Sequence, residues 1–133
     1  MVESFTVTSR AAEEFIDITA VVQGIVSRST IAEGICVVYT PHTTAAVTIN
    51  ENADPAVQKD ILKGLRHLKF DQVDFRHAEG NSHAHINSSL LGCSETIIIN
   101  RGGLSHGTWQ GIYFCEFDGP RTRTVLVAIL NQI

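Results

Sequence analysis

Histidine is the residue type that most clearly offers chemistry in this chain, which holds six histidines among 133 residues. A neutral imidazole nitrogen binds zinc, and the ring also titrates near neutral pH, so grouped histidines serve a metal ion or proton transfer. Three of them, His77, His83 and His85, fall within nine residues. On a helix that begins near Asn81, His85 lies on the same face as Asn81, whereas His83 points in another direction. We therefore expect His77 and His85 to converge.

A third member of this group has to come from another segment. His42 is the best candidate because it lies in a Pro-His-Thr-Thr turn between two apolar stretches, where loops at the end of a sheet build sites. The resulting expectation is a divalent metal, zinc or magnesium, held by His42, His77 and His85. The spacing matches no short metal signature, and the alternative for each histidine is an exposed or hydrogen-bonded side chain.

Two carboxylates fall where an unpaired charge would be costly. Glu51 directly follows an apolar stretch, and Glu116 lies within an aromatic-rich stretch, so each needs a partner. The functional interpretation is a general acid or base, a metal ligand, or a group that orients a histidine. The alternative is a salt bridge to Arg101, Arg121 or Arg123.

A third feature could bind phosphate. Gly80-Asn81-Ser82 opens a predicted helix and presents free N–H groups, which is how a backbone binds an anion. Arg121 and Arg123, which flank Thr122, could supply the counter-charge. The alternative, which the pattern alone favours, is an ordinary solvated strand end.

Composition narrows the class of protein. The formal net charge of −4 and the scattered basic residues argue against nucleic-acid binding, which needs clustered Lys and Arg. No apolar run approaches the roughly 18 residues of a membrane span. The three cysteines are widely spaced, which suits buried thiols in a reducing compartment better than a disulfide framework. We expect one cytoplasmic domain over residues 1–133.

The elements that must position these residues follow from hydrophobic periodicity. One predicted helix is capped by Thr19 and ends near 27–29. The second is capped by Asp54 and the third runs from about 80–82 to 91 and stops at Gly92. The second helix is expected to bury Val57, Ile61, Leu62, Leu65 and Leu68. The predicted strands are 2–8, 14–19, 34–40, 44–50, 94–100, 107–118 and 121–130, the first two as a hairpin.

This order excludes a doubly wound parallel fold. It predicts an α+β protein, mainly an antiparallel β-sandwich with two or three helices. The strand at 107–118 is apolar on both faces, which indicates a central position or burial against a partner chain.

Several blocks in this chain resemble, in order, the signature of a known family. They are His42-Thr43-Thr44-Ala45-Ala46, Asn50-Glu51-Asn52-Ala53-Asp54-Pro55, Glu79-Gly80-Asn81 with Ala84-His85-Ile86, Gly107-Thr108-Trp109-Gln110, and Glu116-Phe117-Asp118-Gly119-Pro120-Arg121. Together they resemble the YjbQ family of secondary thiamine-phosphate synthases.

The resemblance implies a jelly-roll-like sandwich, a homotrimer, and the joining of a hydroxymethylpyrimidine pyrophosphate to a thiazole phosphate. By matching positions, it implies Glu51, Glu116 and Gln110 as catalytic residues. The other implied site residues are Thr43, Asn52, Asn81 and Arg121 for substrate binding, with His42, His77 and His85 at the metal.

Two other functions use the same residues. One is a metal-dependent hydrolase in which zinc activates water, and the other is a non-catalytic trimer that binds a phosphorylated metabolite. His83 and His106 fall outside the family pattern, so the sequence assigns them no role.

Overall fold

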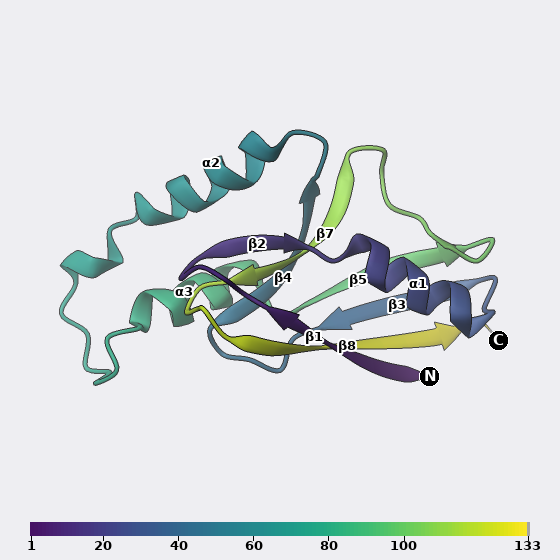
Figure 1. Cartoon of the computed structure of the whole chain (residues 1–133), viewed down its shortest axis with the longest axis horizontal. Coiled ribbons are helices and arrows are strands. Elements are labelled where there is room, and N and C mark those ends of the chain that lie inside the picture. The colour runs from purple at the N-terminus through teal and green to yellow at the C-terminus, as the bar shows by residue number, and fades with distance from the viewer. Residues whose placement is uncertain (133) are drawn as a thin grey trace.

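The computed structural model describes residues 1–132, apart from the side chain of Asp71. Within that range the strands form two antiparallel sheets (Figure 1). The larger sheet has the order β1-β8-β3-β5-β6, with strands Val2–Thr8, Thr122–Asn131, Gly34–Tyr39, Ser94–Asn100 and Gly103–Leu104. The smaller sheet has the order β2-β7-β4, with strands Glu14–Asp17, Gln110–Glu116 and Ala45–Glu51.

One apolar core joins the two sheets. It takes alternate side chains from the strands of both sheets and the buried face of helix α1 (Thr19–Ser29), which contacts β6, β7 and β8. Its largest fully buried members include Phe114, Ile99, Ile112 and Ile25. Alternation with period two puts Ile112 and Phe114 of β7 on this face, as the sequence predicts.

The opposite face of the smaller sheet has a core of its own. Tyr113, Cys115 and Phe117 pack there with residues of α2 (Pro55–Arg66) and α3 (Ser82–Leu91). A short 3₁₀ turn, η1 (Phe70–Gln72), lies between these helices in the chain. The strand β7 is therefore covered on both faces within one chain.

The structure confirms the α+β class, three helices and antiparallel sheets. The sandwich and jelly-roll arrangement stays a prediction. The predicted hairpin of the first two strands is wrong, because β1 pairs with β8 whereas β2 pairs with β7. The segment between them crosses from one sheet to the other beside the β7–β8 turn, where Ser9 N–H donates to the Arg121 carbonyl at 2.9 Å.

The start of α2 forms as its sequence predicts, but its burial differs. Asp54 accepts a hydrogen bond from the Ala56 N–H at 2.9 Å, and Pro55 occupies the first turn. None of the α2 residues is fully buried, and the helix contributes only the partly buried Leu62 and Leu65 to the second core. Leu68, predicted to be buried, follows the helix and is 53% exposed.

Two further predictions concern location. None of the helices in the described range has the length and apolar character needed to cross a bilayer. The cysteines are free thiols, with Cys36 and Cys115 buried and Cys93 exposed. Burial raises the pKa of the Cys36 thiol to about 11, which keeps that thiol protonated and unreactive.

Candidate functional site

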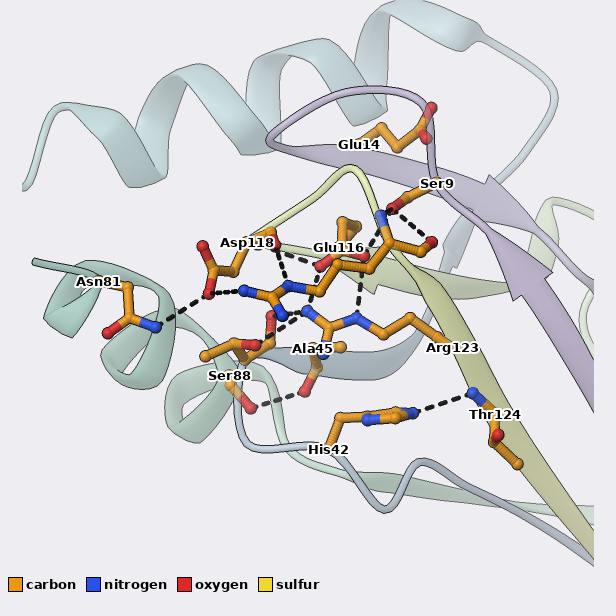
Figure 2. A network of polar contacts seen from close by, with 12 residues as sticks. Ser9, Glu14, His42, Ala45, Asn81, Ser88, Glu116, Asp118, Arg123 and Thr124 are labelled. Atoms are coloured by element: carbon orange, nitrogen blue, oxygen red, sulfur yellow. Dashed lines mark hydrogen bonds and ion pairs between the residues drawn. The ribbon is translucent and has the colours of Figure 1, made fainter. Parts of the chain in front are cut away.

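Three segments that are distant in sequence line one pocket of about 340 Å³. They are the turn after β3, the loop that enters α3 with the first turns of that helix, and the β7–β8 turn with the start of β8. Figure 2 shows the polar network behind this pocket. The lining residues are Pro41, His42, Thr43, Thr44, His77, Glu79, Asn81, His85, Asp118, Arg121 and Arg123.

The His42 ring is held by the backbone of β8. Its Nε2 accepts a hydrogen bond from the Thr124 N–H at 2.9 Å (Figure 2). The ladder between β3 and β8 ends at the pair Tyr39–Leu126, so the imidazole satisfies a backbone donor just beyond the end of that ladder. A neutral ring that accepts at Nε2 carries its proton on Nδ1.

Electrostatics favour this neutral form. Partial burial, followed by the nearby Arg123 guanidinium, lowers the pKa of His42 below its ordinary value, and the Glu116 carboxylate offsets part of the effect. His42 therefore offers the pocket an Nδ1–H donor rather than a charge.

His77 and His85 contact each other directly. Their ring centroids lie 5.2 Å apart at an interplanar angle of 88°. His77 precedes α3 and His85 lies within its first turns. The two rings, eight residues apart in sequence, therefore meet as predicted. His77 Nε2 also lies 3.9 Å from a carboxylate oxygen of Glu79, and both of these side chains are exposed.

The three histidines do not fit a closed metal site in this arrangement. In the described part of the chain, no three His, Cys, Asp or Glu side chains are placed to hold one ion. The reason at His42 is that its single lone pair is already engaged by the Thr124 N–H. The predicted set is thereby reduced to His77 and His85, which is fewer than the three protein ligands of a catalytic zinc.

A buried ion pair lies at one wall of the site, where Arg123 lines the pocket and Glu116 does not. Glu116 is fully buried and pairs with Arg123, whose Nε lies 3.0 Å from Oε1. Arg123 also donates to the Thr44 hydroxyl at 2.9 Å, and Ser9 donates to Glu116 at 2.7 Å. Burial alone would raise the pKa of Glu116, but hydrogen bonds from Arg123, Ser9 and the Asp118 N–H outweigh it and lower the pKa.

The pair has a positioning role in this geometry. Glu116 has the salt bridge that the sequence offered as the alternative to catalysis, and its partner is Arg123. Through Arg123 it fixes Thr44 and hence the turn that carries His42.

Asp118 connects the remaining polar groups, and sequence reasoning missed it. Its carboxylate accepts a hydrogen bond from Asn81 Nδ2 at 2.9 Å (Figure 2). It also accepts one from Arg121 at 3.1 Å. Its carbonyl also accepts from Arg121 Nε at 2.7 Å. The sequence presents Asp118 only as part of an Asp-Gly-Pro turn, which hides its side-chain role. Arg123, predicted beside Arg121 as a counter-charge for an anion, lines the pocket, but its guanidinium pairs with Glu116. Thr44 was missed as a lining residue for a similar reason, because it lies at the start of an apolar strand pattern.

The comparisons with known proteins agree with this architecture. A family model described as "UPF0047 protein YjbQ-like" matches residues 3–132. The chain belongs to the YjbQ family. The UPF0047 protein of Methanocaldococcus jannaschii is 52% identical over 99% of this chain and 96% of its own length. The UPF0047 protein YugU of Bacillus subtilis is 46% identical over 98% of this chain and all of its own length.

Solved structures of the YjbQ type share the fold. The crystal structure of an uncharacterized conserved YjbQ/UPF0047 family protein from Clostridium acetobutylicum superposes with a TM-score of 0.94 at 52% identity, covering 96% of this chain and 99% of that one. A hypothetical protein from Aeropyrum pernix gives a TM-score of 0.93 at 40% identity, covering 99% of each chain.

Three residues matched to the YjbQ signature lie away from the pocket. Glu51 and Gln110 are cross-strand partners at the far end of the smaller sheet, and Asn52 follows them. Glu51 lies six positions along the strand from Ala45, or roughly 20 Å at the usual rise. Asn52 donates to Asp17 at 3.3 Å and Gln110 accepts from the Gly107 N–H at 2.7 Å, so both serve local structure there.

The histidines without a family match lie apart as well. His83 faces two neighbouring pockets instead of this one. His106 is exposed in the loop before β7, where its Nδ1 lies 3.1 Å from the Gly107 carbonyl.

Proposed function

We propose that this YjbQ-family chain is a secondary thiamine-phosphate synthase, which joins a hydroxymethylpyrimidine pyrophosphate to a thiazole phosphate. The pocket of His42, His77, His85 and Arg121 would bind the pyrophosphate. The observation that carries the proposal is the convergence of three separate signature blocks on this one pocket. Its volume of about 340 Å³ lies in the range of small-molecule sites.

The donors around the pocket suit a polyphosphate. Arg121 is exposed at its rim and uses only part of its guanidinium on Asp118, so N–H groups remain for a ligand. The hydroxyl of Thr43 adds a neutral donor. Asn81 is fixed by Asp118 and so holds the helix start in place.

Catalysis of this reaction depends mainly on neutralising the negative charge of the departing pyrophosphate. The bond between the pyrimidine methylene carbon and the pyrophosphate oxygen breaks, and both electrons leave with pyrophosphate. The thiazole nitrogen then donates its lone pair to that carbon, which completes the coupling. Positioning of the two reactants and stabilisation of the departing anion supply the catalysis, and Arg121 with the His42 Nδ1–H provides the second of these.

A divalent cation, zinc or magnesium, stays a separate proposal. Of the three predicted histidine ligands, only His77 and His85 could bind this cation, because the Nε2 lone pair of His42 already accepts the Thr124 N–H. The proposed chemistry above uses only groups of the protein.

Assembly as a homotrimer is also part of the proposal. The outer face of the larger sheet carries a cross-strand row of exposed apolar side chains, Ile98, Ile35 and Leu130, at 63%, 39% and 50% exposure. A contiguous apolar row on a sheet supports contact with further copies. We also propose that the two sheets are the layers of a jelly-roll-like sandwich, and that the protein is cytoplasmic.

The test is a coupling assay with the purified chain and both phosphorylated substrates. The proposal predicts that thiamine phosphate and pyrophosphate form in equal amounts, and only when both substrates are present. Pyrophosphate release from the pyrimidine substrate alone would indicate a metal-dependent hydrolase instead. Tight substrate binding without any product would indicate the non-catalytic binding protein.

A further inference from the structure

A cavity of about 360 Å³ adjoins the pocket that is proposed above for pyrophosphate. This η1 cavity lies between η1, the loop after it and the start of α3, and His77 lines both hollows. The stretch from 77 to 85 forms a wall common to the two. Glu79, Asn81 and His85 line the pyrophosphate pocket, whereas Gly80, Ser82 and His83 line the η1 cavity. A ligand that lies against His77 can therefore extend past one imidazole into either hollow.

The two hollows differ in chemistry. The pyrophosphate pocket has Arg121 at its rim, and Pro41 is the sole apolar side chain in its described lining. The η1 cavity has three large apolar side chains, Phe70, Val73 and Phe75, and no Lys or Arg among its described lining residues. A flat ring would bury apolar surface against the protein in the η1 cavity, but not in the pyrophosphate pocket.

The apolar side chains of the η1 cavity are open to water. Val73 is 54% exposed and Phe75 is 37% exposed, beside the half-buried Phe70. Apolar side chains that gather around a hollow mark a ligand site, in contrast to single exposed ones. An aromatic ring placed there would stack on Phe75 and cover this surface.

Asp74 adds a polar requirement to the same cavity. Its carboxylate is the one formally charged group in the described lining, and a carboxylate accepts hydrogen bonds from N–H donors. An amino group on the ring would supply such a donor. The two hollows thus suit the two ends of one molecule, with phosphate beside Arg121 and an amino-substituted ring beside Asp74.

We propose that the η1 cavity is the ring subsite of the same ligand, and that it takes an amino-substituted pyrimidine whose pyrophosphate lies against Arg121. Phe75 packs on the ring, Asp74 accepts from the exocyclic amine, and the methylene carbon between ring and pyrophosphate passes beside His77. The assignment rests on the proposed function for the pyrophosphate end of the ligand. It also places His83, which lies outside the YjbQ pattern, in the wall of the ring subsite.

The test compares two probes by calorimetry in the absence of the thiazole substrate. They are hydroxymethylpyrimidine pyrophosphate and inorganic pyrophosphate. The native chain should bind the ring-bearing probe at least about tenfold more tightly, because stacking and burial of the ring add to the pyrophosphate contacts. Phe75→Ser should reduce this ratio of dissociation constants to below roughly threefold and leave the Kd of inorganic pyrophosphate unchanged.

The matched control is Leu68→Ser. Leu68 is 53% exposed in the same connection between α2 and α3, but it lines neither hollow, so this variant should keep the native ratio. Phe75 and Val73 are both exposed, and a melting temperature checks that each variant folds. Val73→Ser is the second variant in the same cavity, and it should also lower the ratio.

Asp74 has a test of its own. Asp74→Ala should weaken binding of the amino-bearing probe roughly fivefold, because the amine loses a charged acceptor. Binding of the analogue that lacks the amine should not change. Equal weakening of both compounds would remove Asp74 from the ring subsite.

The outcomes separate this proposal from the proposed function. A ratio that falls in Phe75→Ser supports the ring subsite even if no thiamine phosphate forms in the coupling assay. Product formation together with a native ratio in both Phe75→Ser and Val73→Ser would overturn the subsite and keep the coupling function. Equal affinity of the native chain for the two probes, or binding of neither, would also overturn the subsite.

Discussion

The Thr124 N–H donates to Nε2 of His42 at 2.9 Å, and this contact joins the β3–β4 turn to the start of β8. It fixes the ring, assigns its proton to Nδ1, and engages the lone pair that a metal would need. One backbone donor therefore decides whether His42 acts as a metal ligand or as a hydrogen-bond donor.

The first prediction concerns this ring. Its pKa should lie below the ordinary 6.5, because burial and Arg123 disfavour the imidazolium. Nitrogen-15 NMR through a pH titration should show a protonated Nδ1 and a bare Nε2 at neutral pH. A ring protonated at Nε2, or a pKa above 6.5, would contradict the assigned contact.

The second prediction concerns the buried pair of Glu116 and Arg123. Glu116→Gln leaves Arg123 buried without its counter-charge, so the free energy of unfolding should fall by about 3 kcal/mol. Chemical denaturation measures this. The matched control is Glu3→Gln, which breaks the exposed pair with Arg28 and should cost less than about 1 kcal/mol.

The Glu116–Arg123 pair also makes the free energy of unfolding depend on pH in the acidic range. The pKa of Glu116 is lower in the folded protein than in the unfolded chain. Its contribution to the free energy of unfolding is therefore present above the unfolded-state pKa of about 4.3 and is lost as pH falls through the lower folded-state pKa. The loss of stability in that acidic range should be smaller in Glu116→Gln than in the native chain. An equal loss in both proteins would show that Glu116 is not the titrating group.

How far the sequence predicts this molecule depends on how local each signal is. The N-cap of α2 at Asp54 and the end of α3 at Gly92 are local, and they form as predicted. Strand pairing is not local, so β1 and β2 look like a hairpin although each pairs with a strand near the C-terminus.

The site follows the same rule. His77 and His85 lie eight residues apart, and their contact could be anticipated. The link between His42 and Thr124 spans 82 residues through a backbone N–H, which no side-chain pattern records. Asp118 was hidden in a turn motif for a related reason, since its partners come from other segments.

The third prediction concerns Asn52, which the YjbQ signature places in the site and the structure places against β7. A Cβ added at Gly111 would lie 2.5 Å from Asn52 Nδ2. Gly111→Ala should therefore lower the free energy of unfolding by about 1–3 kcal/mol. Adding Asn52→Gly, which also removes the Asn52 Cβ that lies 2.8 Å from the new methyl group, should recover much of that loss. Additive effects in this double-mutant cycle would contradict the packing role.

The fourth prediction concerns assembly. Ile98→Glu places a charge in the exposed apolar row, so it should convert the proposed homotrimer to monomers in light-scattering measurements at micromolar concentration. Val21→Glu alters an exposed apolar residue of α1 and should leave the trimer intact. A trimer that survives Ile98→Glu would show that the interface lies on another face.

The most direct measurement is the coupling rate of Arg121→Met beside that of Arg28→Met. Both arginines are exposed and paired with a carboxylate, but only Arg121 lines the pocket. With pyrophosphate as the leaving group, Arg121→Met should lower kcat/KM by roughly a hundredfold while Arg28→Met changes it less than twofold. An Arg121→Met protein that couples the two substrates at the native rate would contradict the proposed site.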